Sequence, residues 1–247
     1  MDRLIYTAMS GAKQIFTQQA GVAHNLANAA TTGYRALEHK FRAVQVQGEG
    51  MPTRAFVADA SVKNIFDQGP LLSTGRSLDI ALQGAGWFAV EMADGTEAYT
   101  RAGNLRVNAD GMLQTADGHN VLSDGGPINI PPDNRVEIAP DGTVSVVPLY
   151  GTPNTTNNVD QIKLVNPPED QLVRGGDGFF RVAGGAPAEV DPNVRVASGV
   201  LEGSNVNVTD VMVNLISLAR QFEMQIRMLQ NADTNARAAS QIIGTGQ

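Results

Sequence analysis

The chain contains no cysteine among its 247 residues. Disulfide bonds and thiolate metal sites are therefore excluded, and an oxidising compartment suits the protein only if its fold needs no cross-links. Long apolar runs are absent too, so we expect no membrane insertion, and the start MDRLIYTAMSGAKQIF holds no signal-peptide core. Any export is therefore expected to use a route that removes no signal peptide. Basic residues are few, and the net charge of −7 disfavours nucleic acid as a partner.

Proline and glycine are scarce at both ends of the chain. All 12 prolines lie between Pro52 and Pro192, and 20 of the 26 glycines lie between residues 46 and 200. Because proline breaks helices, the ends can form long helices and the middle cannot. The middle also carries the acidic charge, with ten basic and nineteen acidic residues between 46 and 200. Hydrophobic residues make up 42% of the chain, which is enough for a folded core.

The first segment has the periodicity of a helix that lies along another helix. Apolar and small residues recur at alternating spacings of three and four, a heptad pattern that predicts a helix over about residues 3–28. The positions of this N-terminal seam are Ile5, Ala8, Ala12, Ile15, Gln19, Val22 and Leu26.

The last segment repeats this pattern. Asn207 or Thr209 is a suitable N-cap, Asp210 suits the positive end of the helix dipole, and Gly244 and Gly246 end the helix. The positions of this C-terminal seam are Val208, Met212, Leu215, Ala219, Phe222, Ile226, Leu229 and Asp233. We expect the two seams to pack on each other or on neighbouring copies of the chain. An ordinary amphipathic surface helix on a globular core is the alternative.

The middle of the chain is typical of antiparallel β structure. Asp-Gly pairs recur between short apolar runs, and such pairs favour type I′ hairpin turns, which need positive φ. The pairs begin at Asp94, Asp110, Asp117, Asp124, Asp141 and Asp177. The sequence therefore predicts an α+β fold. Residues 1–45 form a helix and turn that pack as a coiled coil with the helix of residues 205–247. Residues 46–75 form an extended connector, and residues 76–200 form a central antiparallel β domain.

No stretch predicts catalysis or a cofactor. His24, His39 and His119 have no metal-ligand spacing to one another or to a helical glutamate. The Gly84-Ala85-Gly86 loop precedes a strand, whereas a dinucleotide site needs a strand-to-helix turn. The Asp-Gly pairs lack the spacing of a calcium-binding loop. We therefore expect no catalytic residue, no metal and no cofactor.

Three passages together resemble the axial proteins of the bacterial flagellum, the family of rod and hook subunits. Residues 86–122 are similar to the family's central β domain, and residues 198–243 to its C-terminal helix. The stretch NLANAATTGYR, residues 25–35, resembles the family's N-terminal signature. The signature residues here are Asn25, Leu26, Asn28, Thr32, Gly33, Tyr34 and Arg35. The matching C-terminal residues are Leu201, Glu202, Ser204, Asn205 and Val206.

The resemblance implies a structural subunit of the basal-body rod, the drive shaft that crosses the periplasm, transmits torque and encloses the export channel. It implies export through the flagellum's own type III apparatus, and assembly with other copies and with proximal and distal rod subunits. The chain's start and short length resemble proximal-rod subunits more than distal ones. The distal-rod type is the nearest alternative, because both types share the three passages.

Two alternatives come from other classes: an extracellular β-rich binding module with helical oligomerisation arms, and an enzyme with a site at strand ends. The binding module would need a cluster of aromatic residues, yet aromatic residues are only 5% of the chain. The enzyme would need a recognisable set of titratable residues, and the sequence shows none. Both alternatives are therefore weaker than the rod subunit.

Two further expectations concern polar residues. Gln19 and Asp233 stand at seam positions where apolar side chains would bind more tightly, so we expect them to fix the register of association. Asn25 and Asn28 flank the N-terminal seam. They either bond to a neighbouring copy's backbone or cap the last carbonyls of their own helix, and Gly33 ends that helix with a positive φ.

Overall fold

The chain divides into two compact units in a computed structural model that describes residues 2–45, 55–149 and 156–244. The helical unit consists of Met1–Ala29, Ala36–Ile65 and Val206–Gln247. The β unit consists of Ala30–Arg35 and Phe66–Asn205. The chain therefore passes between the units at four places, and both of its ends belong to the helical unit.

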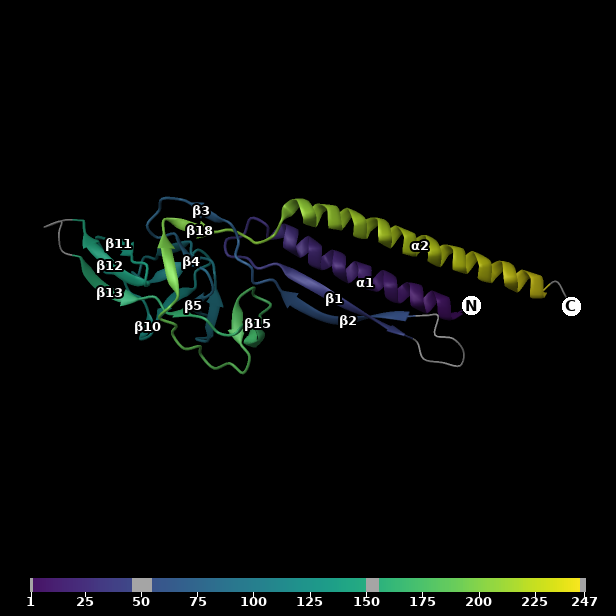
Figure 1. The fold of residues 1–247 in the computed structure, drawn as a ribbon, viewed down its shortest axis with the longest axis horizontal. Coiled ribbons are helices and arrows are strands. Elements are labelled where there is room, and N and C mark those ends of the chain that lie inside the picture. Colours follow the sequence, from purple (N-terminus) through teal and green to yellow (C-terminus); the bar gives the residue numbers. More distant parts are fainter. Residues whose placement is uncertain (1, 46–54, 150–155, 245–247) are drawn as a thin grey trace. The chain divides into compact units, whose positions relative to one another are not determined.

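The helical unit contains two long helices and one β-hairpin. Helix α1 spans Asp2–Ala27 and α2 spans Val208–Gly244. They lie side by side and run in opposite directions (Figure 1). Both helices agree with the predicted ends, and Asn207 is the N-cap of α2, since its Oδ1 accepts a hydrogen bond from the Thr209 N–H at 3.1 Å. The proposed end at Gly246 lies outside the described residues.

The hairpin of the helical unit consists of β1 (Leu37–Gln45) and β2 (Ala55–Asn64), which pair antiparallel with an irregularity between Lys40 and Phe41. The sequence instead predicts a turn where the first strand lies and an extended connector where the second strand lies. A register irregularity interrupts the alternation of apolar and polar residues in such a pair, and residues 46–54 contain no two-residue turn signal. The pattern therefore shows neither strand clearly.

The β unit is built from short antiparallel strands. Its largest sheet has nine strands, in the order β15-β16-β6-β5-β9-β8-β7, with β10 pairing β9 and β14 pairing β5. A three-stranded sheet has the order β11-β12-β13, and β17 pairs with β4 and β18 with β3. The strands are β3 (Leu71–Ser73), β4 (Ile80–Gln83), β5 (Trp87–Glu91), β6 (Glu97–Thr100), β7 (Leu105–Val107), β8 (Leu113–Thr115), β9 (Asn120–Ser123), β10 (Gly126–Pro127), β11 (Asn134–Ile138), β12 (Thr143–Pro148), β13 (Asn157–Gln161), β14 (Leu164–Val165), β15 (Leu172–Arg174), β16 (Phe180–Val182), β17 (Arg195–Ser198) and β18 (Val200–Glu202), with a 3-10 turn at Glu169–Gln171.

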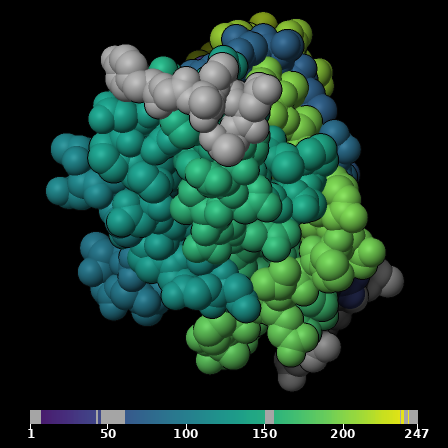
Figure 2. Space-filling view, turned by 90° about the vertical axis from the view of Figure 1, so that its left-hand side faces the viewer, coloured from purple at the N-terminus to yellow at the C-terminus, as the bar shows by residue number. Residues whose placement is uncertain are grey.

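Because late strands pair with early ones, the second half of the β unit completes the sheet begun by the first half. Strand β14 pairs with β5, and β16 pairs with β6. In the space-filling view of Figure 2, the teal first half and the green second half of this unit lie against each other on the face towards the viewer.

All six Asp-Gly pairs join adjacent antiparallel strands, which confirms the predicted hairpins. The turn type differs from the predicted type I′. The aspartates do not have positive φ, whereas glycines such as Gly95 (φ 77°) and Gly142 (φ 85°) do. The Gly95 N–H donates to the Met92 carbonyl at 2.9 Å, and the Met92 N–H donates to the Thr96 carbonyl. This arrangement is a type I turn followed by a glycine in the left-handed region.

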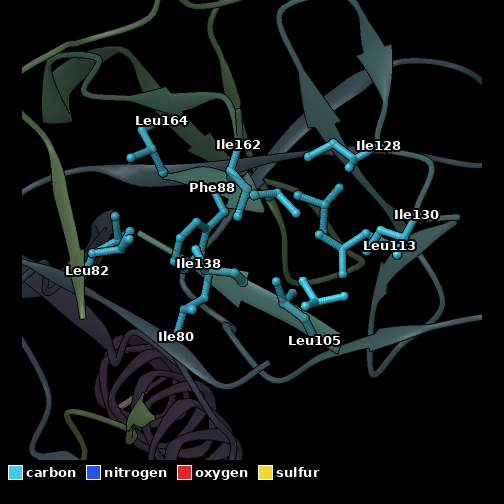
Figure 3. Close-up of a cluster of buried hydrophobic side chains, with 14 of the residues drawn as sticks. Ile80, Leu82, Phe88, Leu105, Leu113, Ile128, Ile130, Ile138, Ile162 and Leu164 are labelled. Carbon is cyan, nitrogen blue, oxygen red and sulfur yellow. The ribbon is translucent and has the colours of Figure 1, made fainter. Parts of the chain in front are cut away.

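The core of the β unit is a cluster of aliphatic side chains around Phe88 (Figure 3). The cluster draws on strands of several sheets, with Phe88 on β5 of the nine-stranded sheet, Val144 on β12 of the three-stranded sheet and Ile80 on β4. A second cluster is aromatic and surrounds Trp87, whose ring centroid lies 4.6 Å from that of Phe180 and 5.9 Å from that of Phe66. Alternate residues of β5 thus face different clusters, as expected for a strand buried on both faces.

Candidate assembly surface and motif junction

Small residues of α1 allow α2 to approach closely. Ala8 and Ala12 are buried, and a Cβ built on Gly11 would lie 3.6 Å from the side chain of Gln225 on α2. Val22 is also buried. The remaining described positions of the N-terminal seam, Ile15, Gln19 and Leu26, are partly buried, and the side chain of Ile5 lies outside the described residues.

On α2 the predicted seam follows the buried face only over its central part. Leu215, Ala219, Phe222, Ile226 and Leu229 are partly buried. Three other seam residues, Val208, Met212 and Asp233, are exposed.

Among the α2 residues whose side chains are described, Leu218 is the most buried, and the predicted seam omits it. Asp233 forms an i,i+4 ion pair with Arg237 at 2.9 Å. Its carboxylate therefore does not lie between the two helices of one chain, and a role in register remains a prediction about contacts between copies.

A second group of apolar side chains on α2 is exposed to solvent. Val213, Ile216, Met224 and Met228 are between 48% and 63% exposed. At about 100° per residue, they lie within roughly 120° of the helix circumference, centred about 140° from Leu218. We call these four residues the outer stripe. Helix α1 has a smaller counterpart in Met9 and Phe16, which are 54% and 63% exposed.

The two asparagines of the N-terminal motif make bonds inside their own unit. Asn25 is buried, and its side chain pairs with the backbone of Leu37, accepting from the N–H at 2.9 Å and donating to the carbonyl at 2.8 Å. It thereby holds the start of β1 against the end of α1. Asn28 donates to the carbonyl of His24 at 2.9 Å, so it is the cap of the last turn.

The rest of the motif belongs to the β unit, where Gly33 makes a sharp turn with φ 68°, as predicted. A Cβ at this position would lie 2.4 Å from the backbone of Arg101, so the site also lacks room for a side chain. Tyr34 is buried beneath Arg174, whose Cζ lies 4.6 Å from the ring centroid. Arg174 also donates to the Arg35 carbonyl at 2.8 Å. Thr32 is partly buried.

Arg35 of the N-terminal motif meets Glu202 of the C-terminal motif in the interior. Its Nη2 lies 2.6 Å from Glu202 Oε1, and both side chains are fully buried. Arg101 completes the group from the middle of the chain, donating from Nη1 to Glu202 Oε2 at 2.9 Å. The Gly69 N–H donates to Oε1 at 3.0 Å. We call Arg35, Gly69, Arg101 and Glu202 the motif junction.

Neighbouring residues of the C-terminal motif extend these contacts. Ser204 is buried, and the Asn205 N–H donates to the Tyr34 carbonyl at 3.3 Å. Leu201 pairs with Leu72 in the two-stranded sheet of β18 and β3, and Val206 is partly buried.

Burial dominates the electrostatics of this region. It lowers the pKa of Arg101, and the Glu202 carboxylate opposes that shift. Arg101 also donates to the carbonyls of Gly86 at 2.9 Å and Gly84 at 2.6 Å. Burial likewise raises the pKa of the Tyr34 hydroxyl, against the influence of Arg174. These groups form a structural ion-pair network in the protein interior.

The histidines do not converge. His24 is exposed, the ring of His39 packs at Gly21, and the ring of His119 lies 4.7 Å from that of Phe179. Within residues 2–45, 55–149 and 156–244, no group of three or more His, Cys, Asp or Glu is placed to hold a metal ion. No helix in the described part of the chain is long and apolar enough to cross a membrane.

Three family models match the chain in order. Residues 5–35 match the flagella basal body rod protein, residues 81–146 the D1 domain of the flagellar hook protein FlgE/F/G, and residues 197–242 the C-terminal part of the flagellar basal body rod FlgEFG protein. Curated relatives extend the similarity to nearly the whole chain. The flagellar basal-body rod protein FlgF of Salmonella typhimurium strain LT2 is 43% identical over 249 residues, covering 98% of this chain and 99% of the relative.

The chain belongs to the flagellar basal-body rod protein family. The FlgF of Escherichia coli strain K12 is also 43% identical, with the same coverage. The FlgG of Agrobacterium fabrum strain C58 is 35% identical over 261 residues, covering 96% of this chain and 98% of the relative. The matched rod-protein segments contain both halves of the Arg35–Glu202 pair, so the family's two terminal motifs meet at the motif junction.

Proposed function

We propose that this chain is a structural subunit of the flagellar basal-body rod, of the type called FlgF in its relatives. The observation that carries the proposal is full-length similarity to rod proteins, with three family models matching in order along one chain. FlgF relatives reach 43% identity and FlgG relatives 35%, which favours the proximal-rod type over the distal-rod alternative. The binding-module and enzyme alternatives have no comparable support.

The helical unit supports a mode of assembly. Its outer stripe keeps four large apolar side chains in water, and their burial against a neighbour would contribute about 25 cal/mol per Å² of apolar area. A helix that carries large apolar side chains on two sides suits a position between two neighbours. We propose that one face of α2 packs on α1, in a coiled-coil manner, while the outer stripe packs on the next subunit.

The partners of this assembly would be other copies of the chain and other rod proteins, proximal and distal. The outer stripe and the surface it meets are different, so the contact does not close on itself and propagates as a helix of subunits. Such a tube is the drive shaft that spans the periplasm, transmits torque and encloses the export channel. The chain would reach it through the flagellar type III export apparatus, without loss of a signal peptide.

Deleting the gene in its own bacterium tests the proposal. We expect the deletion to stop swimming and to yield basal bodies without a complete rod, because each rod protein contributes its own part of the shaft. Supplying the intact chain from a plasmid should restore both swimming and the rod. Deletion cells that swim normally, with complete basal bodies, would show that the chain is not a required rod subunit.

A further inference from the structure

One buried carboxylate joins three segments that are far apart in the sequence. Glu202 Oε1 accepts from the Gly69 N–H at 3.0 Å and lies 2.6 Å from Arg35 Nη2, while Oε2 accepts from Arg101 at 2.9 Å. The Glu202 side chain has no solvent exposure. With no water to replace a lost partner, the loss of this carboxylate would leave the Gly69 N–H and one Arg101 donor unpaired and would remove the ion-pair partner of Arg35.

Backbone bonds tie two of these segments, those of Arg35 and Gly69, to the segment that carries Glu202. The Gly33 N–H donates to the Glu202 carbonyl at 2.8 Å, and the Gly203 N–H donates to the Pro70 carbonyl at 2.8 Å. A Cβ built on Gly69 would lie 2.1 Å from the Gly203 carbonyl oxygen, so these two segments pass in direct contact. Segments 31–35, 67–70 and 202–205 therefore form one packed group inside the β unit.

These segments adjoin the places where the chain leaves the β unit. Arg35 is the last residue of Ala30–Arg35, Gly69 is close to the start of Phe66–Asn205, and Glu202 is close to the end of that range. The carboxylate thus joins the β-unit ends of three of the four chain crossings.

The junction holds two positive side chains and one negative side chain in the protein interior. Two guanidinium groups share one carboxylate, and the side chains of Arg35 and Arg101 are 0% and 5% exposed. Among the described residues, Arg35 Nε and Nη1 have no hydrogen-bond partner. Because a buried charge without a partner is strongly unfavourable, the loss of Glu202 drives both arginines towards water.

We propose that the motif junction is a latch, meaning that each of the chain's two terminal motifs stays folded only while the other does. Segment 31–35 is held only while 202–205 is in place, and the converse is also true. The β core does not depend on the latch, since its aliphatic cluster is formed by other residues. This coupling holds whether or not the chain assembles into a rod.

Hydrogen–deuterium exchange on the full-length monomer tests the latch, with Glu202→Gln compared with the natural chain. Exchange should rise together in 31–35, 67–70 and 202–205, by at least about tenfold, because a hydrogen bond to a charged group is worth a factor of that size. Protection of β5 should be unchanged. A rise confined to 202–205 would overturn the proposal.

Glu97→Gln is the matched control, because it also removes one carboxylate of a nearly buried ion pair, to Lys163 at 2.8 Å, within the β unit. We expect its effect to stay near residues 97 and 163. The same rise in all three junction segments would mean general loosening and would contradict the latch. Where Glu202→Gln does not fold, Arg35→Met replaces it. Exchange must then rise in 202–205, and a change limited to 31–35 refutes the coupling.

Discussion

Cells whose protein carries both Val213→Asp and Met224→Asp are expected not to swim, although the variant monomer should fold normally. Both side chains are more than 60% exposed, so the double substitution should change the free energy of unfolding by no more than about 1 kcal/mol. In the assembled rod, the outer stripe would instead place two carboxylates in a water-poor contact, where each costs several kcal/mol. Swimming distance in soft agar and urea unfolding of the purified monomer measure the two effects.

Asn214→Asp is the control for this experiment. It adds one negative charge to the same helix, next to Val213, at an exposed position outside the outer stripe. Swimming should stay within a small factor of that of the natural chain. If the double variant swims normally, the outer stripe is not an assembly surface. If Asn214→Asp abolishes swimming to the same extent, added charge alone explains the loss of swimming.

Phe180→Ala is expected to destabilise the β unit by about 3–5 kcal/mol, the usual cost of removing a buried phenylalanine ring. Phe180 is 3% exposed and packs against Trp87, with the ring centroids 4.6 Å apart. Trp87 is the single tryptophan, so its fluorescence reports the unfolding of this unit directly. Denaturant titration followed by that fluorescence gives the change in the free energy of unfolding.

The neighbouring Phe179→Ala removes an identical ring from a partly exposed position, where it contacts His119. We expect it to cost less than about 1.5 kcal/mol, since most of the lost area was not deeply buried. If both variants lose the same free energy of unfolding, the view that the aromatic cluster around Trp87 stabilises the β unit is contradicted.

Features that depend on local spacing could be predicted from the sequence. Both long helices follow from apolar periodicity, from the absence of proline at the chain ends and from the scarcity of glycine there. The hairpins follow from the Asp-Gly pairs, because positive φ at a glycine such as Gly95 is a local requirement. The turn type was wrong because the same glycine serves a type I turn followed by a left-handed residue.

Features that depend on tertiary partners could not be predicted. A heptad pattern indicates that a helix packs, but it does not say that Leu218 is buried while Met212 is exposed. Likewise, Glu202 reads as a polar motif residue. Its burial depends on Arg35 and Arg101, which lie 167 and 101 positions away in the sequence. Long-range ion pairs of this kind have no periodic signature.

Cross-linking inside isolated basal bodies tests most directly the central claim that the outer stripe of α2 joins neighbouring rod subunits. The chain has no cysteine, so Met224→Cys creates its one thiol, and Asp117→Cys places a control thiol in an exposed turn of the β unit. With a short cross-linker that reacts with a thiol at one end and, after illumination, with any nearby group at the other end, we predict that Met224→Cys joins the chain to another copy or to another axial protein, and that Asp117→Cys does so far less. Basal bodies that contain the Met224→Cys protein but yield no cross-linked product would contradict the account.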